Sequence, residues 1–386
     1  MRVGILTLFH NNDNYGAVLQ AYALNRVLRY QGHEVKTITY DAHHYGFISK
    51  VKFAFRFHNK IEIFRHVIKL MKKFFFRGSL RQNMNSKKAD AFAIFKEKYI
   101  PHTKEVYDDS NLTTINALFD AFVCGSDMVW HLGCADISTA YWLKFAASSK
   151  KRVSYAASMS QKTIDSIQQK QIQETLPTFD AVSVRESSSV DLLNRCLEKP
   201  MNIDWVLDPV FLLTAEDWQN TFLLKGFSCD YICVYLLSPS SKTVREINEY
   251  SRVIGKRVRL IPTDGLNSAN CPAEWDCMMD EAPVHFINTL MGASVVITDS
   301  YHGFVFSLIF NREVFSVLRF SSSSEHDNSR IESLMKMLPV QSCVLSNNFS
   351  HKELLIAKPL DYKKINSVLA LWRKNSLQFL RESLEN

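Results

Sequence analysis

A short polar turn at residues 300–303, Ser-Tyr-His-Gly, stands between two apolar segments. The residues before it have the pattern of a buried strand, and those after it the pattern of an apolar helix. Where a strand leads into a helix, free backbone N–H groups and the helix dipole favour a bound anion. We expect Ser300, His302 and Gly303 to hold a negatively charged group, with His302 able to transfer a proton. A histidine that only caps the helix is the alternative.

Two arginines are further candidates for binding an anion. Arg185 ends an apolar run and Arg330 stands in the tripeptide Asn-Ser-Arg, each beside a predicted helix start. A guanidinium group can bind a carboxylate or a phosphate through two parallel hydrogen bonds. The alternative is a structural salt bridge, with Glu186 and Glu332 as the nearby acids. The sequence leaves both interpretations open.

The loop after the first predicted strand is rich in amides and acids. It places Asn12, Asp13, Asn14 and Tyr15 before Gly16. Such side chains can bind sugar hydroxyls, and a glycine lets the backbone approach a ligand closely. An Asn/Asp-rich helix cap is an equally good explanation.

Other predicted strands also end in polar residues. The run 120–127 ends in Gly-Ser-Asp, which makes Ser126 and Asp127 candidates, because ligands of open α/β sheets bind beyond the carboxyl ends of the strands. Ordinary turn chemistry gives the same pattern. For Asp208, which precedes Pro209, we expect a role in organising the turn.

Several known binding motifs for nucleotides and metals are absent from the sequence. It lacks the glycine-rich dinucleotide fingerprint and the Walker loop, and its eight cysteines lack zinc-ligand spacing. We therefore expect neither a metal nor a cofactor. Several cysteines lie in apolar runs, which is typical of reduced core cysteines and indicates a cytoplasmic location. No run reaches the roughly 18 apolar residues of a membrane span, so we expect neither an exported nor an integral membrane protein.

Predicted strands and helices alternate along the chain, as in α/β proteins with parallel sheets. Strand 2–8, helix 17–32 and strand 33–40 form a βαβ unit. The pattern restarts with a strand at 231–238 and continues with helices near 241–254 and at 283–292 and 302–311. We expect two Rossmann-like domains that face each other across a cleft. They would comprise residues 1–225, with an insertion at about 45–110, and residues 226–386, with a last helix at about 361–383.

Taken together, the motifs resemble the polysaccharide pyruvyl transferase family. The resemblance rests on six segments in the same order and spans nearly the whole chain, with the insertion at about 45–110 least matched. The segments are LFHNNDNYGAVLQAYAL, FVCGSDMVW, SVRESSSVDLL, VLDPVFLL, VITDSYHGFVFSLIFNREVF and NSRIESLM.

The resemblance implies a glycosyltransferase-B-like fold and a function. Pyruvate would pass from phosphoenolpyruvate to two hydroxyls of a sugar, in a polysaccharide or its lipid-linked precursor, as a cyclic ketal, with release of phosphate. His302 would be the acid/base residue, and Asp127 could activate the attacking hydroxyl. The donor would bind to Arg185, Ser300, His302, Gly303 and Arg330, and the acceptor to Asn12, Asp13, Asn14, Tyr15, Ser126 and Asp127.

Two other functions suit the same architecture, because fold alone does not fix chemistry. One is a glycosyltransferase that uses a nucleotide sugar, and the other is a non-catalytic glycan-binding protein. We expect no nucleic acid as a partner.

The net charge of +7 is unevenly distributed. Residues 50–88 hold twelve Lys/Arg and one acid, Glu62, so the rest of the chain is slightly acidic. From Lys60 to Phe76 apolar residues recur at helical spacing among basic ones. This pattern is typical of a helix that binds an anionic membrane surface, which would hold the enzyme on the inner face of the cytoplasmic membrane. A helix packed on its own domain is the alternative.

Overall fold

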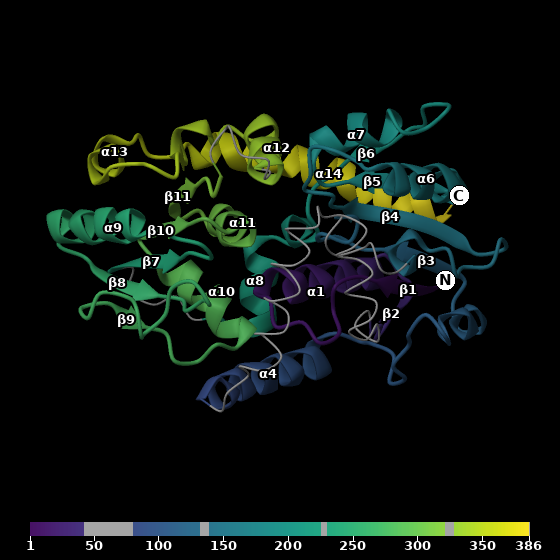
Figure 1. Ribbon diagram of the computed structural model, residues 1–386, viewed down its shortest axis with the longest axis horizontal. Helices are drawn as coiled ribbons and strands as arrows, with labels where there is room; N and C mark the ends of the chain where they lie inside the picture. Colours follow the sequence, from purple (N-terminus) through teal and green to yellow (C-terminus); the bar gives the residue numbers. More distant parts are fainter. Residues whose placement is uncertain (42–79, 132–138, 225–229, 321–327, 386) are drawn as a thin grey trace, which may run out of the picture.

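The computed structural model describes residues 1–41, 80–131, 139–224, 230–320 and 328–385. Each half of the chain builds one parallel six-stranded sheet flanked by helices (Figure 1). The first sheet has the order β2 (Glu34–Thr37), β1 (Arg2–Leu6), β3 (Ala121–Cys124), β4 (Lys151–Ala157), β5 (Ala181–Val184), β6 (Asp204–Trp205). The second has the order β12 (Val344–Leu345), β11 (Glu313–Val317), β10 (Val295–Thr298), β7 (Tyr231–Tyr235), β8 (Arg257–Leu260), β9 (Asp276–Cys277).

Helices cover both sheets and fill the space between them (Figure 1). The α-helices are α1 (Tyr15–Tyr30), α4 (Leu80–Tyr99), α6 (Ser166–Thr175), α7 (Ser187–Asn194), α8 (Ala215–Phe222), α9 (Ser241–Ile254), α10 (Pro283–Gly292), α11 (Tyr301–Ile309), α12 (Ser329–Met337), α13 (His351–Ile356) and α14 (Tyr362–Glu385). Short 3₁₀ helices are η1 (Leu112–Ala117), η2 (Ala140–Trp142), η3 (Leu176–Thr178), η4 (Pro209–Leu212) and η5 (Gln341–Cys343).

Local signals explain where these elements begin and end. Helix α9, for example, starts at the N-cap Ser240, whose side chain accepts a hydrogen bond from the Thr243 N–H. It ends at Gly255, which adopts φ 65°, a conformation that a glycine reaches without strain. Such local chemistry is readable from sequence, and the predicted helix near 241–254 is confirmed.

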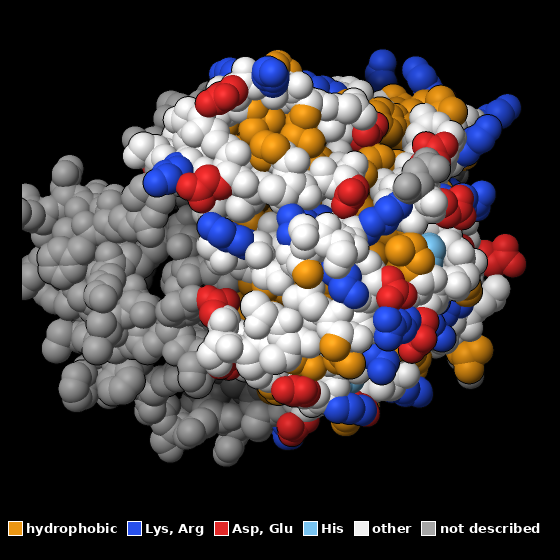
Figure 2. Space-filling view, turned by 90° about the vertical axis from the view of Figure 1, so that its right-hand side faces the viewer, with side chains coloured by type: hydrophobic (Ala, Val, Ile, Leu, Met, Phe, Trp, Pro, Cys, Tyr) orange, Lys and Arg blue, Asp and Glu red, His pale blue; other side chains and the backbone are white. Residues whose placement is uncertain are grey.

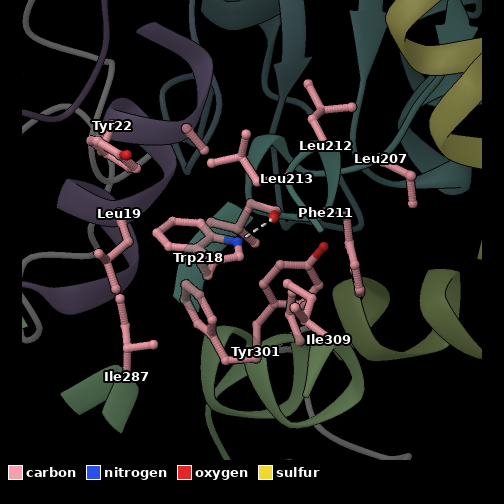
Figure 3. Packing of buried hydrophobic residues seen from close by; sticks show 14 of the residues in the cluster. Leu19, Tyr22, Leu207, Phe211, Leu212, Leu213, Trp218, Ile287, Tyr301 and Ile309 are labelled. Carbon is pink, nitrogen blue, oxygen red and sulfur yellow. Dashed lines mark hydrogen bonds between the residues drawn. The ribbon is translucent and has the colours of Figure 1, made fainter. Parts of the chain in front are cut away.

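One hydrophobic cluster joins the two halves. Trp218 of α8 lies between Tyr22 of α1, at 5.5 Å between ring centroids, and Phe306 of α11, at 5.0 Å. Figure 3 shows Trp218 among residues from both halves, with its indole N–H donating to the Val210 carbonyl at 3.2 Å. Truncating such a buried tryptophan to alanine costs about 3–5 kcal/mol. The halves therefore share a core.

Each sheet has a switch point, where the strand order reverses. In the first sheet it lies between β1 and β3, and in the second between β7 and β10. The loops after β1 and β3 carry residues 9–14 and 125–130, and the loop after β10 leads directly into α11. Ligands of doubly wound sheets bind at such points, so the topology directs attention to these loops.

Two earlier expectations fall outside the described residues. The helix expected from Lys60 to Phe76 belongs to 42–79, and the domain boundary near 225 falls within 225–229. Among the described residues, no helix combines the length and apolar character that a bilayer span needs. On the face shown in Figure 2, basic and acidic side chains are interspersed.

Candidate active site between the two sheets

The site lies where residues that follow the first sheet meet the first turn of α11. Gly16, in the first turn of α1, lies against His302. Arg185, which follows β5, stacks its guanidinium on the Tyr301 ring, with 4.5 Å from Cζ to the ring centroid. Strand-end residues of both sheets thus converge on one helix start.

A tight cap holds the start of α11. Ser300 is the N-cap, and its hydroxyl accepts a hydrogen bond from the Gly303 N–H at 3.4 Å. At position 303 a Cβ atom would come within 2.6 Å of Thr298 Oγ1, so only glycine fits without displacement. The predicted turn residues Ser300 and Gly303 therefore have structural reasons for their identity, whatever they bind.

His302 is nearly buried between the halves. A Cβ atom at position 16 would come within 1.9 Å of its Nδ1, so the ring needs glycine there. On another side, Nε2 lies 3.5 Å from Asp208 Oδ2. This nitrogen is buried and has no hydrogen-bond partner among the described residues. An unsatisfied buried nitrogen calls for an explanation, and the Asp208 carboxylate that faces it is the nearest candidate partner.

Arg185 is buried and surrounded by acids. Its NH1 donates to Asp208 Oδ2 at 2.7 Å, and its Nε donates to Glu186 Oε1 at 3.3 Å. Burial lowers the pKa of Arg185, but Asp208 and Glu186 raise it more, so it stays charged. Its NH2 has no hydrogen bond within the described chain and lies 4.0 Å from Asp127 Oδ1. One donor group of this arginine is open to a ligand.

The two carboxylate oxygens of Asp208 have different partners, one in the local turn and one in the site. Oδ1 accepts from the Val210 N–H at 3.1 Å, which caps η4 and agrees with the turn role expected from the sequence. Oδ2 accepts from Arg185, faces His302, and receives the Ser126 hydroxyl at 3.4 Å. Burial raises the pKa of this carboxyl, but His302 and Arg185 lower it more, to well below its usual range.

Ser126 and Asp127 lie in the loop after β3, in a region of strained backbone. Ser126 is buried and donates its hydroxyl to the Ala156 carbonyl at 2.7 Å, which favours a structural role. Asp127, Ala156 and Ser160 have φ values of 71°, 51° and 46°, a region that side chains other than glycine rarely adopt. Backbone strain of this kind tends to gather at functional sites.

Arg330 lies in a pocket at the second sheet. The pocket is lined by Asp299, Tyr301, Val317, Arg319, Phe320, Asn328, Arg330 and Ile331. No described residue forms a hydrogen bond or an ion pair with Arg330, whereas Arg319 donates to the Asp299 carbonyl at 3.0 Å. Partial burial lowers the pKa of Arg330, and so do the charges of Arg185 and Arg319. Positive charge without internal compensation is what an anion site needs.

The amide-rich loop acts largely as a helix cap. Asn14 is the N-cap of α1 and accepts from the Ala17 N–H at 3.2 Å. Asn12 accepts from the Asn14 N–H, and its own carbonyl accepts from Lys96 of α4 at 3.3 Å. Asp13 is exposed and lies 3.9 Å from the Lys96 ammonium. The cap explanation therefore holds for Asn14, and Asp13 remains open to solvent and to an acceptor.

Tyr15 is in the interior rather than at a ligand surface. Its ring stacks on Phe286 of α10, with 4.2 Å between centroids, and its hydroxyl donates to the Glu281 carbonyl at 3.0 Å. Lys88 of α4 pairs with Glu281 at 3.1 Å and lies over the Tyr15 ring. This position does not support the expected contact with an acceptor and instead gives Tyr15 a part in joining the halves.

Sequence reasoning missed three contributors. It gave Asp208 no part beyond its turn, left Arg319 out, and considered Gly16 only for approach to a ligand. Arg319 could have been found, because it follows strand β11 as Arg185 follows β5. The contacts of Gly16 and Asp208 with His302 join residues nearly 290 and 94 positions apart and have no local signal.

The arrangement can bind an anion and move a proton. Arg330 has no ion-pair partner among the described residues, the NH2 of Arg185 forms no hydrogen bond with them, and His302 faces the same Asp208 oxygen as Arg185. Among the described residues there is no cluster of three or more His, Cys, Asp or Glu that could hold a metal ion. The six cysteines that the structure describes are free thiols.

Comparison with solved structures identifies the fold. UDP-N-acetylglucosamine 2-epimerase of Neisseria meningitidis aligns over 100% of this chain and 99% of its own, with TM-score 0.51 and 9% identity. The same epimerase of Methanocaldococcus jannaschii covers 96% and 92%, with TM-score 0.48 and 11% identity. MurG of Acinetobacter baumannii covers 99% and 98%, with TM-score 0.46 and 9% identity. The expected pair of Rossmann-like domains in a glycosyltransferase-B-like arrangement is confirmed.

Sequence comparison identifies the family. No curated protein matches the chain. A model of the polysaccharide pyruvyl transferase family matches residues 14–320. This range contains Asp127, Arg185, Asp208 and His302 of the site described above. Because the match covers most of the chain, the protein belongs to the polysaccharide pyruvyl transferase family, which implies a transferase that acts on polysaccharide.

Proposed function

We propose that the protein transfers pyruvate from phosphoenolpyruvate to two hydroxyls of one sugar, in a polysaccharide or its lipid-linked precursor, forming a cyclic ketal and releasing phosphate. One observation supports this most: the Arg185 NH2 and the Arg330 guanidinium, which form no hydrogen bond with any described residue, lie with His302 around Tyr301. Phosphoenolpyruvate has two anionic groups and a carbon that must be protonated. Two cations and an imidazole match these three needs.

The donor itself dictates the sequence of steps. An acid protonates C3 of the enol, and C2 becomes an electrophile with oxocarbenium character. One sugar hydroxyl attacks C2 and loses its proton, and the second hydroxyl then displaces phosphate and closes the ketal. The site needs an acid, a base and cations for the carboxylate and the phosphate.

The residues take roles that fit their positions. His302 is the acid, and Asp127 activates the attacking hydroxyl from its place in the loop after β3. Arg330 and the free NH2 of Arg185 bind the donor, with the start of α11 at Ser300 beside them. The exposed loop with Asp13 contributes to the acceptor side.

The reaction needs no cofactor beyond the donor substrate. We place it in the cytoplasm, on the inner face of the cytoplasmic membrane, where a lipid-linked oligosaccharide would be available. This location rests on the basic segment 50–88, of which residues 50–79 lie outside the described part.

The test is to incubate the protein with phosphoenolpyruvate and a panel of lipid-linked oligosaccharides. Phosphate release and the product mass are followed together, and the product gains one pyruvate less one water. His302→Ala should lower kcat about 10²–10⁴-fold, the usual value of general acid catalysis. His285→Ala is the matched control, because His285 is an exposed histidine that pairs with Asp280 away from the site.

Other outcomes favour other functions. Consumption of a nucleotide sugar, with no use of phosphoenolpyruvate, would establish the glycosyltransferase alternative. Glycan binding without turnover of either donor would establish the non-catalytic alternative. Near-normal turnover of His302→Ala would move the proton donor elsewhere.

A further inference from the structure

Asp208 faces the site through a single oxygen. Oδ1 is engaged by the Val210 N–H at 3.1 Å, which belongs to the local turn. Oδ2 lies 3.5 Å from His302 Nε2 and accepts from Arg185 NH1 at 2.7 Å. Asp208 is 1% exposed, so protein groups rather than water surround this oxygen.

The two nitrogens of His302 have different surroundings. Nε2 is buried and faces the Asp208 carboxylate. Gly16 packs against the ring around Nδ1, but Nδ1, unlike Nε2, is not among the buried atoms that lack a partner. A carboxylate beside one imidazole nitrogen holds the proton on that nitrogen and leaves the other nitrogen to exchange its proton with a ligand. The 3.5 Å separation is long for a hydrogen bond, but such contacts often tighten only when substrate binds.

We propose that Asp208 is a positioning residue: its Oδ2 holds the Nε2 proton of His302, and Nδ1 is therefore the nitrogen that gives its proton to C3 of phosphoenolpyruvate. This inference rests on the proposed function. In the step, the Nδ1–H bond breaks and the C3–H bond forms with the enol electron pair. His302 becomes neutral and keeps its proton on Nε2, still bound to Asp208.

The charged groups around His302 show which of them interacts with its imidazole directly. Besides Asp208, the groups around His302 are the Arg185 guanidinium, which shares Oδ2, and the Tyr301 ring at 5.2 Å between centroids. Asp127 and Glu186 lie on the far side of Arg185. From α1 the facing residue is Gly16, which has no charge. Asp208 is therefore the negative charge that the imidazole meets directly.

A simpler role for Asp208 would be to pair with Arg185 only. Glu186 offers the matched control, since it also binds Arg185, at 3.3 Å, but among the described residues it forms no hydrogen bond or ion pair with His302. Asp208→Asn and Glu186→Gln each remove one carboxylate charge beside Arg185 and keep the shape of the side chain. They differ in what they do to His302.

The test uses NMR of the full chain with isotope-labelled histidine, with the His302 signals identified by their loss in His302→Gln. In the unmodified protein, neutral His302 should carry its proton on Nε2. In Asp208→Asn a smaller share of neutral His302 should carry its proton on Nε2, and in Glu186→Gln that share should stay the same. In turnover assays, Asp208→Asn should lower kcat by a factor of ten or more while the KM for phosphoenolpyruvate changes little.

Three results would overturn the inference: a proton on Nδ1 in neutral His302 of the unmodified protein, an unchanged tautomer in Asp208→Asn, or the same change of tautomer in both variants. The tautomer is read in the unmodified chain, so the test survives if Asp208→Asn does not fold. Absence of phosphoenolpyruvate turnover in the unmodified protein would instead overturn the proposed function, and the NMR result would still decide whether Asp208 pairs with His302.

Discussion

Arg185 and Arg330 line one pocket together with Tyr301, yet their surroundings are opposite. Arg185 is buried and bound by Asp208 and Glu186, so its charge is compensated within the protein. Arg330 is half-buried and forms no ion pair with any described residue. The comparison teaches that Arg185 serves mainly to hold the structure together and has only its NH2 left for a ligand. The other has no ion-pair partner among the described residues, as we expect of an arginine that binds an external anion.

The largest effect should come from removing the compensated charge. Arg185→Met leaves Asp208 and Glu186 buried without their cation, and breaking such a pair costs about 3–5 kcal/mol. The free energy of unfolding in urea should fall by that amount. Arg330→Met, the same chemical change in the same pocket, should alter it by less than about 1 kcal/mol. Equal losses in the two variants would contradict the comparison.

The second effect concerns the donor. Arg330→Met should weaken phosphoenolpyruvate binding about tenfold to a hundredfold, because a charge-assisted hydrogen bond contributes about 1.5–3 kcal/mol. Isothermal titration calorimetry with phosphoenolpyruvate measures this directly. Arg257→Met is the control, since Arg257 is exposed at the start of β8. Unchanged affinity in Arg330→Met would reassign Arg330 to a structural role.

A smaller loss is expected when the charge is kept and the shape is changed. Arg330→Lys retains a cation but loses the planar pair of donors, so phosphoenolpyruvate affinity should fall by up to about tenfold. Arg185→Lys cannot reproduce both bonds to Asp208 and Glu186, so its main effect should be on stability. Calorimetry and urea unfolding of both variants would separate the two behaviours. If the same variant showed the larger loss in both affinity and stability, the two arginines would not differ in role.

The smallest effect should be visible only in acid. The folded-state pKa of Asp208 lies below its ordinary value of 3.8 because His302 and Arg185 outweigh the effect of burial. The stability that this group contributes is therefore fully present above about pH 4 and is lost as the pH falls through the folded-state pKa. Urea midpoints between neutral and acid pH should fall less steeply in Arg185→Met than in the unmodified protein, while Arg330→Met should follow the unmodified curve. If only Arg330→Met changed how the urea midpoint falls in acid, Arg330 rather than Arg185 would be the partner of Asp208.

Local patterns made most of the fold predictable. The helices expected at 241–254 and 283–292 begin and end where α9 and α10 do, because their caps and apolar spacing lie within a few residues. The segment 302–311 was also correct to within two residues of α11. Periodicity and capping are short-range properties, so one sequence contains them.

The site was predictable only in part. His302, Arg185 and Arg330 were candidates from their place beside strand ends and helix starts, and the structure brings them together. Sequence could not separate Arg185 from Arg330, because the buried acids that compensate Arg185 include Asp208, which is 23 residues away. Roles of the site residues in binding and catalysis stay predictions until the variants are measured.

Helix α14 ties the end of the chain to its beginning. Its first residue, Tyr362, donates to the Arg312 carbonyl in the second half, and its later residues meet the first sheet, where the Ser376 hydroxyl accepts from the Leu207 N–H at 3.0 Å. Near its end, where α14 runs beside β4 (Figure 1), the Leu384 carbonyl accepts from Lys151 at 3.3 Å. During synthesis, then, the first sheet leaves the ribosome long before the helix that packs on it exists. Until the residues of α14 have been translated, the first half therefore keeps uncovered the apolar face on which α14 packs.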